Sequence, residues 1–179
     1  MSVKKKASGR QSVQVKVEVP GSTQSPAARR SAEAELRTLI AKFAPAHLRL
    51  IGAMRRWLRN RLPTAHEVVY EYRAWIAISY SPNDHGYNGV LAIHADADGV
   101  KLYFTRGKEL PDPAKLLQGS GSQCRSIDVE GASTLARPEV AGLIDEASAR
   151  NPVPFEFAGR GSVVIRSTSA KKRGQSRPA

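Results

Sequence analysis

The spacing of apolar residues changes along the chain, and this change restricts the fold more than any other feature. Between residues 31 and 62, apolar residues recur every three or four positions, as on one side of an amphipathic helix. From residue 70 to 104 they alternate with polar residues, as in strands that bury one face. The helical spacing returns at 138–149. Helices placed before and after a run of strands predict an α+β fold, not an alternating βαβ fold.

Three helices are predicted, over 31–44, 46–62 and 138–149. Ser31 is the predicted N-cap of the first helix, because a serine side chain accepts a hydrogen bond from a free backbone N–H of the first turn. Pro45 is predicted to end that helix, since proline lacks the N–H that the helix interior needs.

The alternating region predicts a run of strands. One runs through 70–80, a second lies near 89–95, a third covers 100–104 and a fourth carries Ile127 and Val129. Two short strands are expected near 154–157 and 162–166. The predicted architecture is a two-layer sandwich, an antiparallel sheet of about four to six strands with helices packed on one face.

The net charge is concentrated at the two ends of the chain. The sequence has 28 Lys and Arg against 16 Asp and Glu, a formal charge of +12. Residues 1–30 contribute +6 and residues 168–179 contribute +4, whereas residues 31–167 contribute only +2. Both ends are poor in large apolar residues, which predicts two disordered basic tails around one domain at 31–167. Such tails are commonly only solubilising; the alternative is weak association with nucleic acid.

The composition excludes several classes of protein. A single cysteine is incompatible with a disulfide framework or a cysteine-rich metal site. No apolar run reaches the length of a membrane span, and the lysines near the N-terminus are not followed by the apolar stretch of a secretory signal. These observations predict a soluble, cytoplasmic protein with no membrane partner.

Six short strings lie between about residues 32 and 150: LPTAHE at 62–67, FTRG at 104–107, LPDP at 110–113, LLQGSG at 116–121, QCR at 123–125 and RPEV at 137–140. With these strings in this order, the chain resembles the YdhG-like family of bacterial domains of unknown function. The resemblance implies a frataxin-like, two-layer α/β fold. Most members have no established activity, and one branch is described as a frataxin-like iron chaperone.

The segment from Arg106 to Arg125 is the best candidate for a binding site. Glycines allow backbone N–H groups to approach an anion closely, and an arginine offers two parallel donors to a phosphate or carboxylate. The structural alternative is a long connection whose glycines serve the backbone and whose arginines face solvent. The candidate residues for an anion or ligand are Arg106, Gly107, Gly119, Gly121, Gln123 and Arg125.

A second group of residues has the chemistry of a metal site. His94, Asp96 and Asp98 are spaced two apart, which places them on one face if the strand extends that far. Asp84 and His85 on a neighbouring loop are the additional candidates. Imidazole and carboxylates bind divalent metals, and the corresponding function that the family resemblance implies is iron handling. The alternative is a turn at 96–99 stabilised by aspartate side chains.

Three further features have mainly structural interpretations. His66 and Glu67 are expected at a new helical turn, with an acid–base role as the alternative. Cys124 is expected to be a half-buried apolar residue, with a thiolate favoured by the neighbouring Arg125 as the alternative. Four arginines of the second helix are expected to form a solvated face, with phosphate binding as the alternative. They are Arg49, Arg55, Arg56 and Arg59.

No nucleophile with a nearby base, no catalytic carboxylate pair and no cofactor motif is visible, so a non-enzymatic function without a cofactor is expected. The leading hypothesis is a binding or chaperone-like module that engages a small anion or a protein partner through the Arg106–Arg125 segment and the open face of the sheet. Iron handling and nucleic-acid association through the tails are the alternatives.

Overall fold

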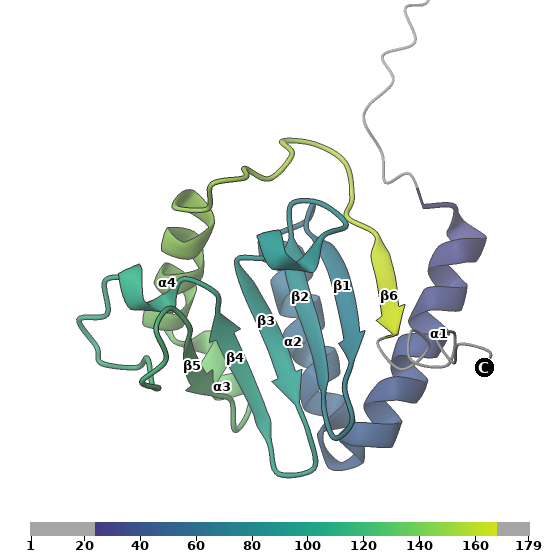
Figure 1. Ribbon diagram of the computed structural model, residues 1–179, viewed down its shortest axis with the longest axis horizontal. Helices are drawn as coiled ribbons and strands as arrows, with labels where there is room; N and C mark the ends of the chain where they lie inside the picture. Colours follow the sequence, from purple (N-terminus) through teal and green to yellow (C-terminus); the bar gives the residue numbers. More distant parts are fainter. Residues whose placement is uncertain (1–23, 168–179) are drawn as a thin grey trace, which may run out of the picture.

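The computed structural model describes residues 24–167, which form a six-stranded sheet with helices on one face (Figure 1). The predicted tail residues 1–23 and 168–179 lie outside the described residues. The helices are α1 (Pro26–Phe43), α2 (Leu48–Arg61), α3 (Ala132–Ala136) and α4 (Pro138–Ala149). Single 3₁₀ turns are η1 (Pro45–His47), η2 (Gly86–Asn88) and η3 (Gly107–Glu109). The strands are β1 (His66–Glu71), β2 (Ile76–Ser81), β3 (Leu91–Ala95), β4 (Val100–Phe104), β5 (Arg125–Asp128) and β6 (Val163–Ser167).

The sheet has the strand order β5-β4-β3-β2-β1-β6, which confirms the predicted α+β class. Strands β1 to β5 pair with antiparallel neighbours, but β6 pairs with β1 in parallel, so the sheet is mixed. The difference from a purely antiparallel sheet arises after α4. The chain crosses from the α4 end of the sheet to its far edge and enters β6 beside the start of β1 (Figure 1).

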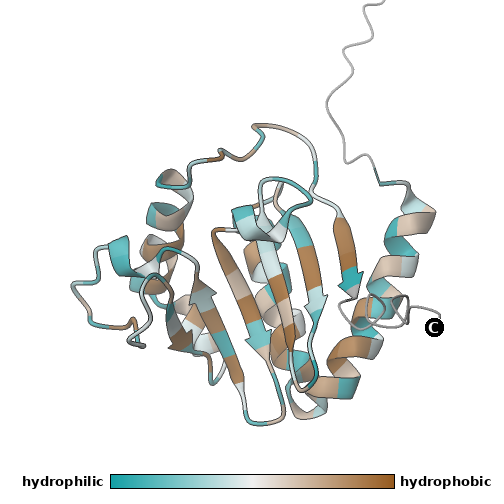
Figure 2. Cartoon of the chain, viewed as in Figure 1, coloured by the Kyte–Doolittle hydropathy of each residue, from teal (hydrophilic) through white to brown (hydrophobic). Residues whose placement is uncertain are grey.

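One row of aliphatic residues crosses the whole sheet in register and faces the helices. The row consists of Ile165, Val69, Ile78, Ile93, Leu102 and Ile127, in the order β6-β1-β2-β3-β4-β5. Brown segments recur along the strands in Figure 2, as expected for strands with one buried face. Buried residues of α1, α2 and α4, such as Leu36, Met54 and Ile144, complete this core.

The first helix begins earlier than predicted. Ser25, not Ser31, is its N-cap, since the Ser25 hydroxyl accepts a hydrogen bond from the Ala28 N–H at 3.2 Å. Pro26 occupies the first turn, where its missing N–H has no cost. Residues 24–30, assigned to the basic tail from composition, therefore belong to the folded domain. The serine–proline pair is a helix-start signal that outweighs the polar composition around it.

Two strand predictions were wrong. The alternating run at 70–80 is a hairpin, because β1 ends at Glu71 and β2 starts at Ile76 after a turn closed by the Tyr72 N–H and the Trp75 carbonyl at 3.0 Å. The alternation continues through the turn and so conceals it. Residues 154–157 form no strand, although the partner at 162–166 corresponds to β6. No helix within residues 24–167 is both long enough and apolar enough to cross a membrane.

Candidate functional site

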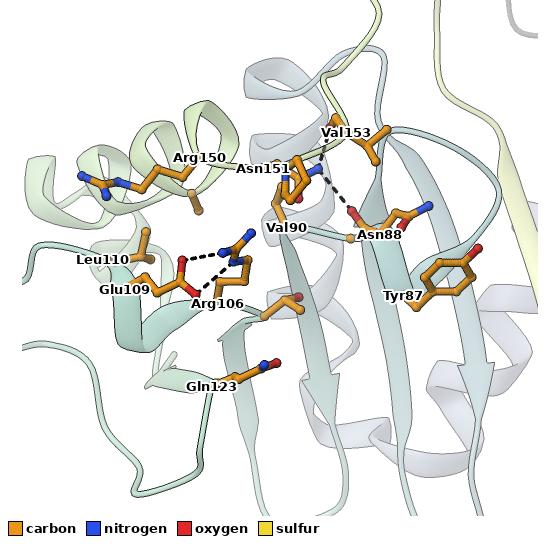
Figure 3. A pocket seen from close by; sticks show the side chains of 14 residues that line it. Tyr87, Asn88, Val90, Arg106, Glu109, Leu110, Gln123, Arg150, Asn151 and Val153 are labelled. Carbon is orange, nitrogen blue, oxygen red and sulfur yellow. Dashed lines mark hydrogen bonds and ion pairs between the residues drawn. The ribbon is translucent and has the colours of Figure 1, made fainter.

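A cavity of about 300 Å³ lies where the end of β4, the start of β3 and the end of α4 meet (Figure 3). The chain positions it through three connections: the η2 loop before β3, the η3 turn after β4, and the segment that follows α4. Apolar atoms of Val90, Leu110 and Val153 line it together with polar residues from all three connections. Mixed walls of this kind are typical of sites for small molecules.

Two arginines flank the cavity. Arg106 donates a hydrogen bond to the Glu109 carboxylate through Nε at 3.1 Å, and its Nη2 forms an ion pair with the same carboxylate at 2.8 Å. Arg150 donates to Glu146 through Nε at 2.9 Å. Figure 3 shows the Arg106 guanidinium in the space between η3 and the end of α4, with Arg150 extending along α4 at the rim. Each guanidinium retains N–H groups that have no hydrogen-bond partner within residues 24–167.

The amide of Asn151 fixes one wall of the cavity. Its Nδ2 donates to the Asn88 carbonyl at 3.3 Å and to the Val153 carbonyl at 2.6 Å, which joins the end of α4 to the η2 loop (Figure 3). On the opposite side, the Lys108 N–H donates to the Gln123 carbonyl at 2.9 Å and holds η3 against the segment before β5. The cavity is therefore framed by hydrogen bonds between segments distant in sequence.

The structure divides the six predicted anion-site residues into two groups. Arg106 and Gln123 line the cavity. Arg125 does not, because its Nη1 donates to the Gly121 and Cys124 carbonyls at 2.7 Å each and ties the loop together.

The glycines of this segment shape the backbone and do not line the cavity. Gly107 is buried, and a Cβ there would approach the Arg125 Cβ at 2.5 Å. Gly119 has φ +109°, a conformation that glycine adopts readily. Neither these two nor Gly121 lines the cavity.

The five predicted metal-ligating residues do not form one site. Asp84 and His85 lie before β3, whereas Asp96 and Asp98 lie in the turn after it, at the opposite end of the sheet. Asp84 pairs with Arg166 at 2.8 Å, and His94 packs its ring 4.4 Å from that of Trp75.

The turn interpretation of the two aspartates is confirmed for one of them. Asp96 Oδ1 accepts hydrogen bonds from the N–H groups of Asp98 and Gly99 at 2.9 and 3.0 Å. Within residues 24–167 there is no group of three His, Cys, Asp or Glu side chains able to hold a metal ion.

Glu67 forms a buried ionic cluster between the two layers. The prediction of a helical turn was wrong: Glu67 lies on β1, on the helix-facing side together with Val69, and is 2% exposed. Its carboxylate accepts hydrogen bonds from Arg55 at 3.0 and 2.8 Å, from Arg59, and from the Tyr80 hydroxyl at 2.8 Å. Glu33 of α1 accepts from the same two arginines. The cluster thus joins α1, α2, β1 and β2.

The cluster shifts the titration of its members. Burial by itself would raise the pKa of Glu67, but the hydrogen bonds and positive charges of Arg55 and Arg59 outweigh burial and hold that pKa below its ordinary value of 4.5. The pKa of Glu33 is lowered in the same way. Burial, together with the neighbouring Glu67 carboxylate, raises the pKa of Tyr80 well above 10.0. At neutral pH the two carboxylates are accordingly ionised, and the Tyr80 hydroxyl keeps its proton.

Two more structural interpretations change. Cys124 is exposed, not half-buried, and its thiol lies 3.4 Å from the Thr105 carbonyl. The four arginines of α2 do not form a uniform solvated face, because Arg55 and Arg59 are half-buried in the Glu67 cluster while Arg49 and Arg56 are exposed.

Some site residues gave no usable signal in the sequence. Asn151 and Asn88 are 63 positions apart, and nothing local to either predicts their contact. Glu67 is different, because the alternation through β1 places it on the same side as Val69. A charged residue that occupies a position where the alternation places buried residues indicates a buried partner of opposite charge. The arginines beside the apolar side of α2 are the residues that could supply it.

Comparisons of the chain with protein-family models, with curated proteins and with solved structures found no match.

Proposed function

We propose that this protein is a non-enzymatic binding module whose ligand is a small organic anion with an apolar part. The observation that carries this proposal is the cavity in which Arg106 stands beside Val90, Leu110 and Val153. A guanidinium with free N–H groups binds a carboxylate or phosphate strongly, and the apolar wall favours a ligand with a hydrocarbon portion. A volume of about 300 Å³ suits a small molecule.

Binding is favoured over catalysis by the side chains that line the cavity. Within residues 24–167, Glu109 is the one carboxylate that lines the cavity, and it is held by a hydrogen bond and an ion pair to Arg106. Among residues 24–167, no histidine, cysteine or lysine lines the cavity to act with it as a base or nucleophile. Membership of the YdhG-like family is part of the same proposal and is in keeping with the α+β fold.

The proposal is tested with simple probes of the expected chemistry. We expect hexanoate, benzoate and phenyl phosphate to raise the melting temperature of the full chain, and hexanamide and benzamide to have no effect. Arg106→Ala removes the main cation and leaves Glu109 without its partner, so we expect anion affinity to fall at least about tenfold, the value of one charged hydrogen bond. Isothermal titration calorimetry measures this change.

Two further variants separate binding from general effects of charge. Arg106→Lys retains the positive charge but loses the planar fork, so it should restore part of the affinity. Arg137→Ala removes an exposed arginine that does not line the cavity and should bind like the wild type. Equal anion binding by Arg106→Ala and the wild type would contradict the proposed site.

A further inference from the structure

An arginine-lined groove runs along the helical layer, away from the cavity described above. It consists of three adjoining hollows of about 450, 820 and 680 Å³ between α1, α2 and residues 159–162. The hollows share walls: Arg56 and Arg59 belong to the first two, Glu33 and Arg37 to the second and third, and Arg160 to the first and third. We refer to the three together as the arginine groove.

The charge of this groove exceeds that of the whole described chain. Eight arginines and two glutamates line it, a net charge of +6. Residues 24–167 carry 19 basic and 15 acidic residues, a net charge of only +4. The near-neutral composition of the domain therefore conceals a strongly polarised surface. The eight arginines are Arg29, Arg30, Arg37, Arg49, Arg55, Arg56, Arg59 and Arg160.

Most of these arginines are available to a ligand. Arg55 and Arg59 bind the two glutamates of the Glu67 cluster, and Arg29 donates to the Gly161 carbonyl at 2.8 Å. The other five are exposed and form no ion pair within residues 24–167. They are Arg30, Arg37, Arg49, Arg56 and Arg160.

The positive charges of the groove lower the pKa of one of its own arginines. The pKa of Arg29 is lowered, first by burial and then by the positive charges of Arg160 and Arg59, which outweigh the opposing effect of Glu33 and Glu67. A lowered arginine pKa that is caused in part by neighbouring cations indicates that positive charges are crowded at that place. The binding of an anionic ligand reduces the repulsion between these crowded charges.

We infer that the arginine groove binds the sugar–phosphate backbone of a nucleic-acid duplex. All of its cations are arginines, whose planar forks match phosphate oxygens better than the point charge of lysine. None of the described residues that line it is aromatic, so this part of the chain lacks the stacking platform that single-strand binding uses. Recognition is therefore through phosphates and independent of base sequence.

The described chain begins beside this groove, where Pro26 and Arg29 belong to its lining. Gln24 and Val163 exchange two hydrogen bonds at 2.7 and 3.0 Å, which ties the start of α1 to β6. The sequence before Gln24 contains five Lys and Arg, and the sequence after Ser167 contains four. Both basic segments add positive charge to the full chain, which increases its attraction for a long polyanion.

The test uses the full chain and a fluorescein-labelled 24-base-pair DNA duplex of mixed sequence in anisotropy titrations. We expect the triple variant Arg37→Glu, Arg49→Glu, Arg56→Glu to weaken duplex binding at least about tenfold at 0.1 M salt. The slope of log K against log salt is negative, and each lost phosphate contact makes it less steep by about 0.9. The three side chains are exposed, so circular dichroism should show an unchanged fold.

A matched control carries the same charge change elsewhere. Arg73→Glu, Lys108→Glu, Arg137→Glu also reverses three exposed cations, none of which lines the groove, and should retain most of the affinity. The inference fails if both triple variants lose affinity equally, since net charge alone then explains binding. It also fails if polyglutamate or phosphatidylserine vesicles compete as well as unlabelled duplex, or if the single strand binds more tightly.

Discussion

Replacing Glu67 by glutamine is expected to lower the free energy of unfolding by about 3–5 kcal/mol, the usual effect of removing one partner from a buried ion pair. The variant leaves Arg55 and Arg59 with a single carboxylate, that of Glu33, which is partly exposed. The stability is lost because the desolvated guanidinium groups of Arg55 and Arg59 then have too little negative charge around them. Urea unfolding followed by circular dichroism measures it.

Two companion variants help to interpret the result for Glu67→Gln. Tyr80→Phe removes only the hydroxyl that donates to Glu67 and should cost about 2 kcal/mol, the value of a hydrogen bond to a charged group. Glu139→Gln changes an exposed carboxylate 3.7 Å from Arg137 and should cost less than about 0.5 kcal/mol. If Glu67→Gln is as mild as Glu139→Gln, the cluster contributes little to stability.

The same cluster predicts how stability depends on pH. The pKa of Glu67 and that of Glu33 are lower in the folded protein than their ordinary value of 4.5. Their contribution is therefore present above that value and is lost as pH falls through the folded pKa. We expect the free energy of unfolding to decline below about pH 4.5, and the decline to be smaller in Glu67→Gln. Parallel slopes for the two proteins would contradict the assignment.

Gly161→Ala is expected to produce the second large loss, about 3 kcal/mol, the upper end of the cost of overpacking. A Cβ at this position would overlap the carbonyl of Ala65 and crowd the His66 nitrogen, both of which are backbone atoms that a rotamer change does not move. Gly161 also donates to the Pro63 carbonyl at 3.1 Å. The substitution therefore pushes β6 away from β1. Thermal unfolding by calorimetry provides the measurement.

Gly142→Ala is the matched control, and its predicted effect has the opposite sign. Gly142 lies in α4, and a Cβ added there meets nothing within 4 Å. Alanine in the interior of a helix is more stable than glycine by about 0.5–1 kcal/mol, so this variant should unfold at a higher temperature. A similar loss of stability in both variants would show that the overlap with Ala65 is not the cause.

The sequence predicted those parts of the fold that depend on local periodicity. Apolar spacing over a few turns or residues predicts the core of α2, the strands β3 and β4 and the whole of α4. The turn between β1 and β2 was missed because alternation continues through it. The parallel placement of β6 was missed because strand order is decided by long-range packing, which no window of residues reports.

The candidate site was predicted only where its residues are neighbours in sequence. Arg106 and Gln123 belong to one segment and both reach the cavity, but the wall formed by Asn151 depends on how α4 ends against the η2 loop. Charge summed by segment was misleading for a similar reason. Folding brings arginines from α1, α2 and the segment before β6 to one groove, whereas the acidic residues of 31–167 are mostly elsewhere.

The parallel pairing of β6 with β1 has a consequence for synthesis of the protein. Nearly a hundred residues separate the two strands along the chain, so this contact forms only after residues 163–167 have left the ribosome. Until then β1 is an open edge, and its unpaired backbone with the adjacent Val68 and Val69 is able to pair with another nascent chain. The last strand therefore protects the first against aggregation. Chains shortened before residue 159 should be recovered mainly as aggregates.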